Sequence, residues 1–160
     1  MTRVVIALGS NMGDRLGHLR AAVEALGRAG VVVGARSGVW ETAPVGPEQP
    51  DYLNAVVVAE TALEPEVLLA ELKRIEREAG RVVGERWGPR PLDLDILFFG
   101  DVVVDSEVLT VPHPRIGERA FVLAPLAEVV DGPLPVLGKR AAVLLERVGS
   151  EGVRRTGESL

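Results

Sequence analysis

The chain has 160 residues, of which 47% are hydrophobic and 26% charged, and its formal net charge is −5 at pH 7. These values are ordinary for a single globular domain spanning residues 1–160, and the acidic balance argues against a nucleic-acid or membrane-surface partner. The absence of cysteine excludes a disulfide framework and a thiolate metal site. No apolar run approaches 18 residues and no signal peptide is evident, so we expect a cytoplasmic protein.

The first half of the chain predicts three strands and two helices. Stretches rich in β-branched residues are expected to be strands: 3–9, 31–40 and 53–61. Apolar residues at helical spacing predict a helix that follows Asp14 as its N-cap and ends at Gly27 or Gly30. A second helix is expected to begin at Pro65 and to end at Gly80. The order therefore starts as strand, helix, strand, strand, helix.

The second half begins with a basic loop and continues with mixed elements. We expect a strand at 92–99 and helices within 110–130 and at 138–149. Gly100 and Asp101 are expected to turn the strand back into 102–105 as a short hairpin. The polar tail, 150–160, is expected to be mobile, and no motif in the last 30 residues indicates chemistry.

The resulting order β-α-β-β-α-β is the ferredoxin-like α+β arrangement, an antiparallel sheet packed with helices, here with C-terminal helical additions. The strands at 31–40 and 53–61 have no helix between them, so we expect them to be antiparallel neighbours. Many unrelated functions use this fold, so the fold alone does not decide what the protein does.

Two aspartates interrupt the apolar strand at 92–99. Asp93 and Asp95 are expected on one face, about 7 Å apart, because side chains alternate along a strand. The opposite face is expected to carry Leu92, Leu94, Ile96 and Phe98. Leu97 and Phe99 follow the aspartates on their own face, which indicates partial burial. An exposed, salt-bridged pair is one interpretation, and a carboxylate pair that binds one or two Mg²⁺ ions is the other.

Basic residues gather in the two loops that flank this strand. The preceding loop contains Arg81, Arg86, Trp87 and Arg90, and the following one contains His113, Arg115 and Arg119. In an arginine-rich chain a single arginine is usually a solvated surface residue, but convergence on a carboxylate pair is typical of polyphosphate sites. Lys73 and Glu76 share a helix face and are interpreted first as a local salt pair.

A different kind of chemistry is indicated near the proline-rich loop at 41–52. Tyr52 and Asn54 have the same strand parity and therefore point to one face. An amide can read the edge of a planar heterocycle, and a tyrosine ring can stack on its face. A tyrosine at the border of the core and an asparagine at a strand start are the structural alternative.

Four motifs resemble, in order, those of the 6-hydroxymethyl-7,8-dihydropterin pyrophosphokinase family. They are "ALGSN", "ETAPVGPEQPDYLNA", "RWGPRPLDLDIL" and "VPHPRIGERAFVLAPL", and the resemblance covers residues 4–130. It implies a ferredoxin-like fold and transfer of diphosphate from ATP to the pterin in folate biosynthesis, with release of AMP. It also implies two Mg²⁺ ions, ATP as co-substrate and a monomeric protein.

The resemblance implies roles for individual residues. Asp93 and Asp95 match the aspartates that hold the two metal ions. Positions matching the pterin site are Thr42, Ala43, Val45, Tyr52, Asn54 and Phe121. Positions matching the ATP site are Lys73, Glu76, Arg81, Trp87, Arg90, Ile96, Thr110, His113 and Arg119. The catalytic set is Asp93, Asp95, Arg90, Arg81 and His113.

The resemblance departs from the family pattern at two places. "VVG" at 82–84 and Val108 stand where some members carry basic residues, so we expect the phosphate contacts to be distributed differently. Two other classes of function stay open on the residues alone. A metal-dependent nucleotide phosphohydrolase would also use paired aspartates, and a non-catalytic ferredoxin-like binding module would need no metal.

Overall fold

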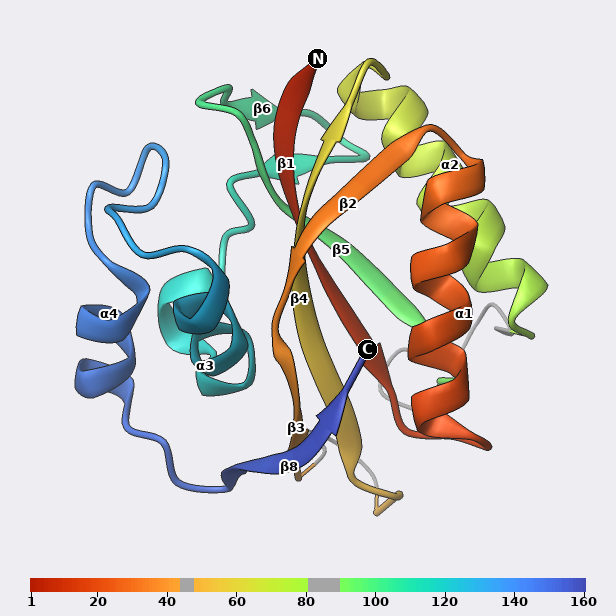
Figure 1. Cartoon of the computed structure of the whole chain (residues 1–160). Helices are drawn as coiled ribbons and strands as arrows, with labels where there is room; N and C mark the ends of the chain where they lie inside the picture. Colours follow the sequence, from red (N-terminus) through yellow and green to blue (C-terminus); the bar gives the residue numbers. More distant parts are fainter. Residues whose placement is uncertain (44–47, 81–89) are drawn as a thin grey trace.

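The structure is a computed structural model that describes residues 1–43, 48–80 and 90–160 (Figure 1). Its main sheet consists of six strands: β1 (Thr2–Ser10), β2 (Val31–Arg36), β3 (Gly38–Thr42), β4 (Tyr52–Thr61), β5 (Asp93–Phe99) and β8 (Val153–Ser159). Their order is β5-β1-β4-β3-β8, with β2 also paired to β4, and every pairing is antiparallel. Helices α1 (Arg15–Arg28) and α2 (Pro65–Glu78) complete the ferredoxin-like pattern, as expected.

The stretch expected as one strand at 31–40 is two strands, β2 and β3, separated at Ser37. The Ser37 backbone nitrogen donates to the Val56 carbonyl at 2.9 Å, and the Val56 nitrogen donates to Ser37 Oγ at 2.9 Å. The side chain thus replaces a backbone partner where the register with β4 shifts. Both strands pair antiparallel with β4, which confirms the expected neighbours.

Helices α1 and α2 cover one face of the sheet (Figure 1). Asp14 caps α1 by accepting from the Gly17 nitrogen at 3.1 Å, and Pro65 occupies the start of α2, as the sequence predicts. Between these helices and the sheet lies the larger apolar core, whose fully buried members include Ile6, Leu8, Leu19, Leu26, Leu68, Leu72 and Leu94. This face is closed by side-chain packing along its length.

The opposite face is covered by α3 (Ala120–Val129), and α4 (Ala141–Val148) packs against α3 on the side away from the sheet (Figure 1). Leu123 and Leu126 of α3 and Ala141 of α4 form a second, smaller core with the strand residues Val5, Val56, Leu97 and Phe98. The helices expected within 110–130 and at 138–149 are therefore present. This second core covers only part of the sheet face, and the remainder forms the candidate site.

The expected faces of two aromatic residues, Phe98 and Phe99, are wrong because β5 contains a bulge. The register with β1 shifts between Val5 and Ile6, where Val5 pairs with Phe98 and Ile6 pairs with Ile96. The extra residue reverses the alternation beyond it. Phe98 therefore packs in the smaller core and Phe99 in the larger one, opposite to the strict alternation expected from the sequence.

The expected hairpin after β5 is wrong in its pairing. Strand β6 (Val104–Asp105) pairs with β7 (Thr110–Val111), and together they form a separate two-stranded sheet. The Val102 nitrogen donates to the Phe99 carbonyl at 3.0 Å, so a turn does follow β5. The chain then passes through a short 3₁₀ helix, η1 (Ile116–Glu118), into α3.

The C-terminal segment, to which the sequence assigned no element, forms β8 and extends the sheet beside β3. Two ion pairs join it to the body of the protein: Arg154 with Glu41, and Arg155 with Glu128, whose Nε and Oε2 are 3.0 Å apart. Charged side chains suit an edge strand, because they discourage further pairing. Within the described residues, none of the helices has the length and apolar character needed to cross a membrane.

Candidate active site

A row of paired residues crosses the open face of the sheet. Gly9 in β1 pairs with Asp93 in β5 on one side and with Asn54 in β4 on the other. Paired residues of neighbouring strands share a face, and neighbouring strands lie about 4.8 Å apart, so the Cα atoms of Asp93 and Asn54 are about 10 Å apart. A Cβ on Gly9 would lie 3.2 Å from Asn54 Oδ1. Glycine therefore keeps the floor between these two polar groups open.

This floor belongs to a cavity of about 690 Å³. Its lining brings together many of the residues singled out in the sequence: Thr42, Ala43, Tyr52, Asn54, Arg90, Asp93, Asp95, Arg119 and Phe121. They come from the ends of β3, β4 and β5 and from the start of α3. Segments far apart in the chain thus converge at one end of the sheet, where the smaller core stops.

At one end of the cavity the two carboxylates influence each other. The pKa of Asp95 is raised from 3.8 to about 7, first by burial and then by the negative charges of Asp93 and Glu76. Lys73 and Arg119 act in the opposite direction. A carboxyl group with this environment favours a cation that would remove the repulsion, and this is the electrostatic condition for a metal site.

Cationic side chains surround the same carboxylates. Arg90 Nη1 lies 3.4 Å from Asp93 Oδ1, and Arg119 is close enough to act on Asp95 electrostatically. The pKa of His113 is lowered, first by burial and then by Arg119, while Asp93 opposes the shift. His113 Nδ1 accepts from the Arg115 nitrogen at 3.3 Å, and its own backbone nitrogen donates to the Leu97 carbonyl at 3.1 Å. A neutral imidazole is therefore favoured near the acids.

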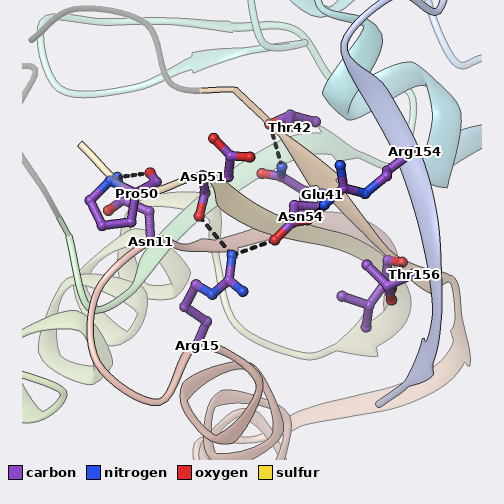
Figure 2. Close-up of polar contacts among 10 residues, drawn as sticks. Asn11, Arg15, Glu41, Thr42, Pro50, Asp51, Asn54, Arg154 and Thr156 are labelled. Carbon is purple, nitrogen blue, oxygen red and sulfur yellow. Dashed lines mark hydrogen bonds and ion pairs between the residues drawn. The ribbon is translucent and has the colours of Figure 1, made fainter. Parts of the chain in front are cut away.

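At the other end of the cavity the lining suits a planar molecule. Asn54 is buried, and its Nδ2 donates to Thr42 Oγ1 at 3.0 Å, which fixes the amide orientation (Figure 2). Tyr52 and Phe121 line the same space from β4 and α3. The Arg119 guanidinium carbon lies 5.5 Å from the Phe121 ring centroid, a cation–π distance. Aromatic walls and an oriented amide can hold and read a flat heterocycle.

Some predicted residues lie away from this cavity lining, as far as the described residues show. Glu76 on α2 is buried, accepts from the Leu94 backbone nitrogen at 2.7 Å, and lies 3.5 Å from Lys73. This confirms the local salt pair expected from the sequence. Ile96 packs in the larger core, and Thr110 is an exposed residue of β7. Val45, Arg81, Arg86 and Trp87 lie outside the described residues.

One wall of the cavity was not anticipated from the sequence. It comes from the segment between α4 and β8 and includes Val148, Gly149, Glu151, Gly152 and Val153. Glu118 and Arg115 add charged groups near η1. The polar, glycine-containing tail carries no clear period-two pattern, because β8 is an edge strand with most side chains exposed. Only its pairing with β3 identifies this wall.

The two carboxylates suit a magnesium ion that also binds water and phosphate, rather than a metal ion held by protein ligands alone. Among the described residues, no group of three or more histidine, aspartate or glutamate side chains could hold a metal ion. Magnesium is commonly bound by one or two carboxylates, with water and substrate phosphate completing its ligands. Asp93 and Asp95, next to Arg90 and Arg119, match that donor set.

These features define a class: an α+β protein of ferredoxin-like topology whose cavity joins a carboxylate pair with cations to a pocket for a planar ring. The model of the 7,8-dihydro-6-hydroxymethylpterin-pyrophosphokinase family matches residues 5–131. The chain therefore belongs to this family, as the motifs indicated.

Individual relatives agree with this assignment. The chain is 52% identical over 128 residues to a mitochondrial folate synthesis bifunctional protein of Pisum sativum, covering 79% of this chain and 25% of that protein. It is 52% identical over 126 residues to the 2-amino-4-hydroxy-6-hydroxymethyldihydropteridine pyrophosphokinase of Bacillus subtilis, covering 78% and 75%. The chain thus spans about a quarter of the length of the plant protein.

A solved structure agrees in fold. The crystal structure of Plasmodium falciparum HPPK-DHPS with pteroate matches with a TM-score of 0.80 and 14% identity, covering 99% of this chain and 49% of that one. At that level of identity the likeness concerns the fold alone.

Proposed function

We propose that this chain transfers the diphosphoryl group of ATP to the hydroxymethyl oxygen of 6-hydroxymethyl-7,8-dihydropterin, a step of folate synthesis. The observation that carries the proposal is the row Asp93–Gly9–Asn54 along the floor of one cavity. This row places a carboxylate suited to magnesium and an amide beside the aromatic lining in the same cavity. The names of the curated relatives from Bacillus subtilis and Haemophilus influenzae support the same reaction.

The proposed chemistry is a direct displacement. The acceptor hydroxyl oxygen forms a bond to the β-phosphorus of ATP, the bond from that phosphorus to the bridging oxygen of AMP breaks, and the hydroxyl proton leaves to solvent. The products are the pterin diphosphate and AMP. Phosphoryl transfer of this kind depends on positioning and charge stabilisation, so the protein needs no covalent nucleophile.

On the nucleotide side, Asp93 and Asp95 would hold two Mg²⁺ ions. Bound there, magnesium would supply charge neutralisation on the phosphate oxygens and on the departing oxygen. Arg90 and Arg119 would bind phosphate oxygens through their guanidinium groups, which match such oxygens in a bidentate way. His113, with its lowered pKa, would contribute a neutral hydrogen-bonding group rather than a third positive charge.

On the acceptor side, Tyr52 and Phe121 would stack on the pterin ring and Asn54 would read its edge. Thr42 orients the Asn54 amide through its hydroxyl. Ala43 and Val45 would add backbone contacts, the latter outside the described residues. Because the Asn54 amide is already held in one orientation, binding of a complementary ring edge costs little further side-chain entropy.

The remaining residues of the predicted ATP site have less direct support. Lys73, Ile96 and Thr110 would act near the nucleotide, and Arg81 and Trp87 in the loop outside the described residues. Glu76 would act through β5, since it accepts from the Leu94 nitrogen and contributes to the raised pKa of Asp95. A single domain, a monomeric state and a cytoplasmic location stay predictions.

The test is to incubate the protein with MgATP, with and without the hydroxymethyl-dihydropterin, and to identify the products by mass spectrometry. We expect AMP and the pterin diphosphate in equal amounts, formed only when the acceptor is present. Release of phosphate or diphosphate without the pterin would instead indicate a nucleotide phosphohydrolase. Unchanged ATP in the presence of magnesium and pterin would reject both activities.

A further inference from the structure

The turn between β1 and α1 is tied to the chain on both sides of the cavity through Asn11. The side-chain nitrogen of this fully buried residue donates to Gln49 Oε1 at 2.7 Å. It also donates to the Pro50 carbonyl at 3.1 Å (Figure 2). Its Oδ1 accepts from the Arg90 backbone nitrogen at 2.7 Å, and its own backbone nitrogen donates to the Arg90 carbonyl at 3.1 Å. One residue thus joins three separate segments.

The orientation of the Asn11 amide is determined by these partners. If the amide were flipped, its oxygen would face two acceptors and its nitrogen would face the Arg90 N–H donor. Asparagine is therefore the residue type that supplies donors on one side and an acceptor on the other at this length. An aspartate would retain only the acceptor, and an alanine would leave buried backbone groups without their partners.

Each partner of Asn11 leads directly to one end of the cavity. Pro50 precedes Tyr52 by two residues at the start of β4, and Arg90 precedes Asp93 by three residues at the start of β5. Tyr52 lines the aromatic end of the cavity, and Arg90 and Asp93 form the ion pair at the carboxylate end. A shift of either strand start would change the separation between the two ends.

We infer that Asn11 is a positioning residue that sets the spacing between the nucleotide and pterin subsites, by holding the starts of β4 and β5 to one turn. This inference rests on the proposed function for the identity of the two ligands. It assigns a role to the asparagine of the "ALGSN" motif. Asn11 does not line the cavity in the described residues, so it acts through its neighbours.

Arg15, the first residue of α1, provides a matched control. Its Nη1 donates to the Asp51 carbonyl at 2.9 Å and to Glu41 Oε2 at 2.7 Å (Figure 2). Both partners belong to the β3–β4 side of the cavity, so Arg15 supports the start of β4 without bonding to Arg90. A comparison of the two variants therefore distinguishes loss of support for the pterin subsite alone from a change in the spacing between the two subsites.

The experiment measures kcat and both KM values for Asn11→Ala, Asn11→Asp and Arg15→Ala. We expect Asn11→Ala to raise the KM for ATP and the KM for the pterin, each about tenfold, the scale of one or two lost hydrogen bonds. Arg15→Ala should raise the pterin KM alone. Asn11→Asp, which keeps the acceptor for the Arg90 N–H, should affect the pterin KM more than the ATP KM.

Amide hydrogen exchange supplies a readout that does not depend on activity. The Arg90 amide should exchange faster in Asn11→Ala and should stay protected in Asn11→Asp and Arg15→Ala. Equal protection of this amide in wild type and Asn11→Ala would overturn the inference, as would an Asn11→Ala effect on one KM only. If Asn11→Ala does not fold, Asn11→Asp provides the test. This variant keeps the acceptor for the Arg90 N–H, so equal increases in the KM for ATP and the KM for the pterin would contradict the inference.

The outcome is separable from that of the proposed function. If the wild-type protein forms no AMP, the proposed function fails, while the exchange of the Arg90 amide still reports whether Asn11 holds the two strand starts together. If the wild-type protein is active and the exchange is unchanged by Asn11→Ala, the positioning role alone is wrong.

Discussion

The two faces of the central sheet show how one set of strands can provide stability on one side and chemistry on the other. On the face of α1 and α2, side chains such as Ile6, Leu8 and Leu94 pack without interruption. On the opposite face, the alternate residues of the same strands include Ala7, Gly9 and Asp95, and these residues line the cavity. Small and charged residues at one end of a strand therefore open a site without weakening the core behind it.

The largest expected effect concerns the carboxylates of the open face. Asp95→Asn should lower turnover by about a thousandfold, because a bound metal contributes several kcal/mol of charge stabilisation in transfer reactions. The isosteric change should leave the circular dichroism spectrum and the folded state intact. Steady-state AMP production in the presence of magnesium measures the effect.

Asp105→Asn is the matched control for this change. Asp105 is also an aspartate in a strand, but it lies in β6, is exposed and does not line the cavity. We expect wild-type turnover for this control. Near-normal turnover in Asp95→Asn would remove the functional difference between the two faces.

On the face covered by α1 and α2, a substitution should affect stability strongly and turnover little. Leu72→Ala in α2 should lower the free energy of unfolding by about 2–5 kcal/mol, because the truncation leaves a cavity in the larger core. At a temperature where the variant is folded, kcat should stay close to the wild-type value. Chemical denaturation gives the stability, and Val67→Ala, at an exposed position of the same helix, is the control with little expected change.

The open floor of the cavity can be tested at Gly9. Gly9→Ala places a Cβ 3.2 Å from Asn54 Oδ1 and 3.5 Å from Tyr52 Cδ1, so it should raise the pterin KM about tenfold, an effect of roughly 1.4 kcal/mol. The KM for ATP should change less. Gly27→Ala in α1 is the control, since its added Cβ meets no atom within 4 Å and the change should stabilise the helix. An unchanged pterin KM would mean that the ring does not approach this floor.

The smallest expected effect is a pH dependence of stability in metal-free protein. The pKa of Asp95 is raised from 3.8 to about 7, so between these values the folded state holds a proton that the unfolded state has released. The free energy of unfolding contributed by this group therefore falls as pH rises through that window. Asp95→Asn should remove the loss and raise Tm by about 2–5 °C at pH 8 but not at pH 4.5.

Thermal unfolding in a chelator at both pH values measures this difference. Asp105→Asn, on an exposed strand, should show the same Tm offset from wild type at both values. An offset for Asp95→Asn that did not change with pH would indicate that its carboxyl group titrates normally.

Much of the fold was predictable because local patterns and tertiary packing agree. The cap at Asp14, the proline at the start of α2 and the β-branched runs all specify elements that the sheet then pairs. The failures occur where non-local pairing overrides a local pattern. The β5 bulge exchanged the faces of Phe98 and Phe99, and β6 found β7 rather than β5 as its partner.

The candidate site divides in the same way. Alternation along a strand was enough to place Asp93 with Asp95, and Tyr52 with Asn54, on common faces. Alternation does not report how strands align across the sheet, so it could not show that Gly9 joins the two pairs in one row. The contribution of Glu151 and Val153 to the cavity wall was equally invisible before β8 was paired with β3.

By itself the sequence determined the class of fold, the strand that carries the acids and the motifs that indicate the family, because these depend on periodicity and on residue type within short stretches. Only the tertiary structure decided which of these stretches meet, how the Asn11 turn bridges two of them, and that the polar tail closes a wall. Strand register and long-range hydrogen bonds are set by the packing of the whole chain, and no short stretch contains that information.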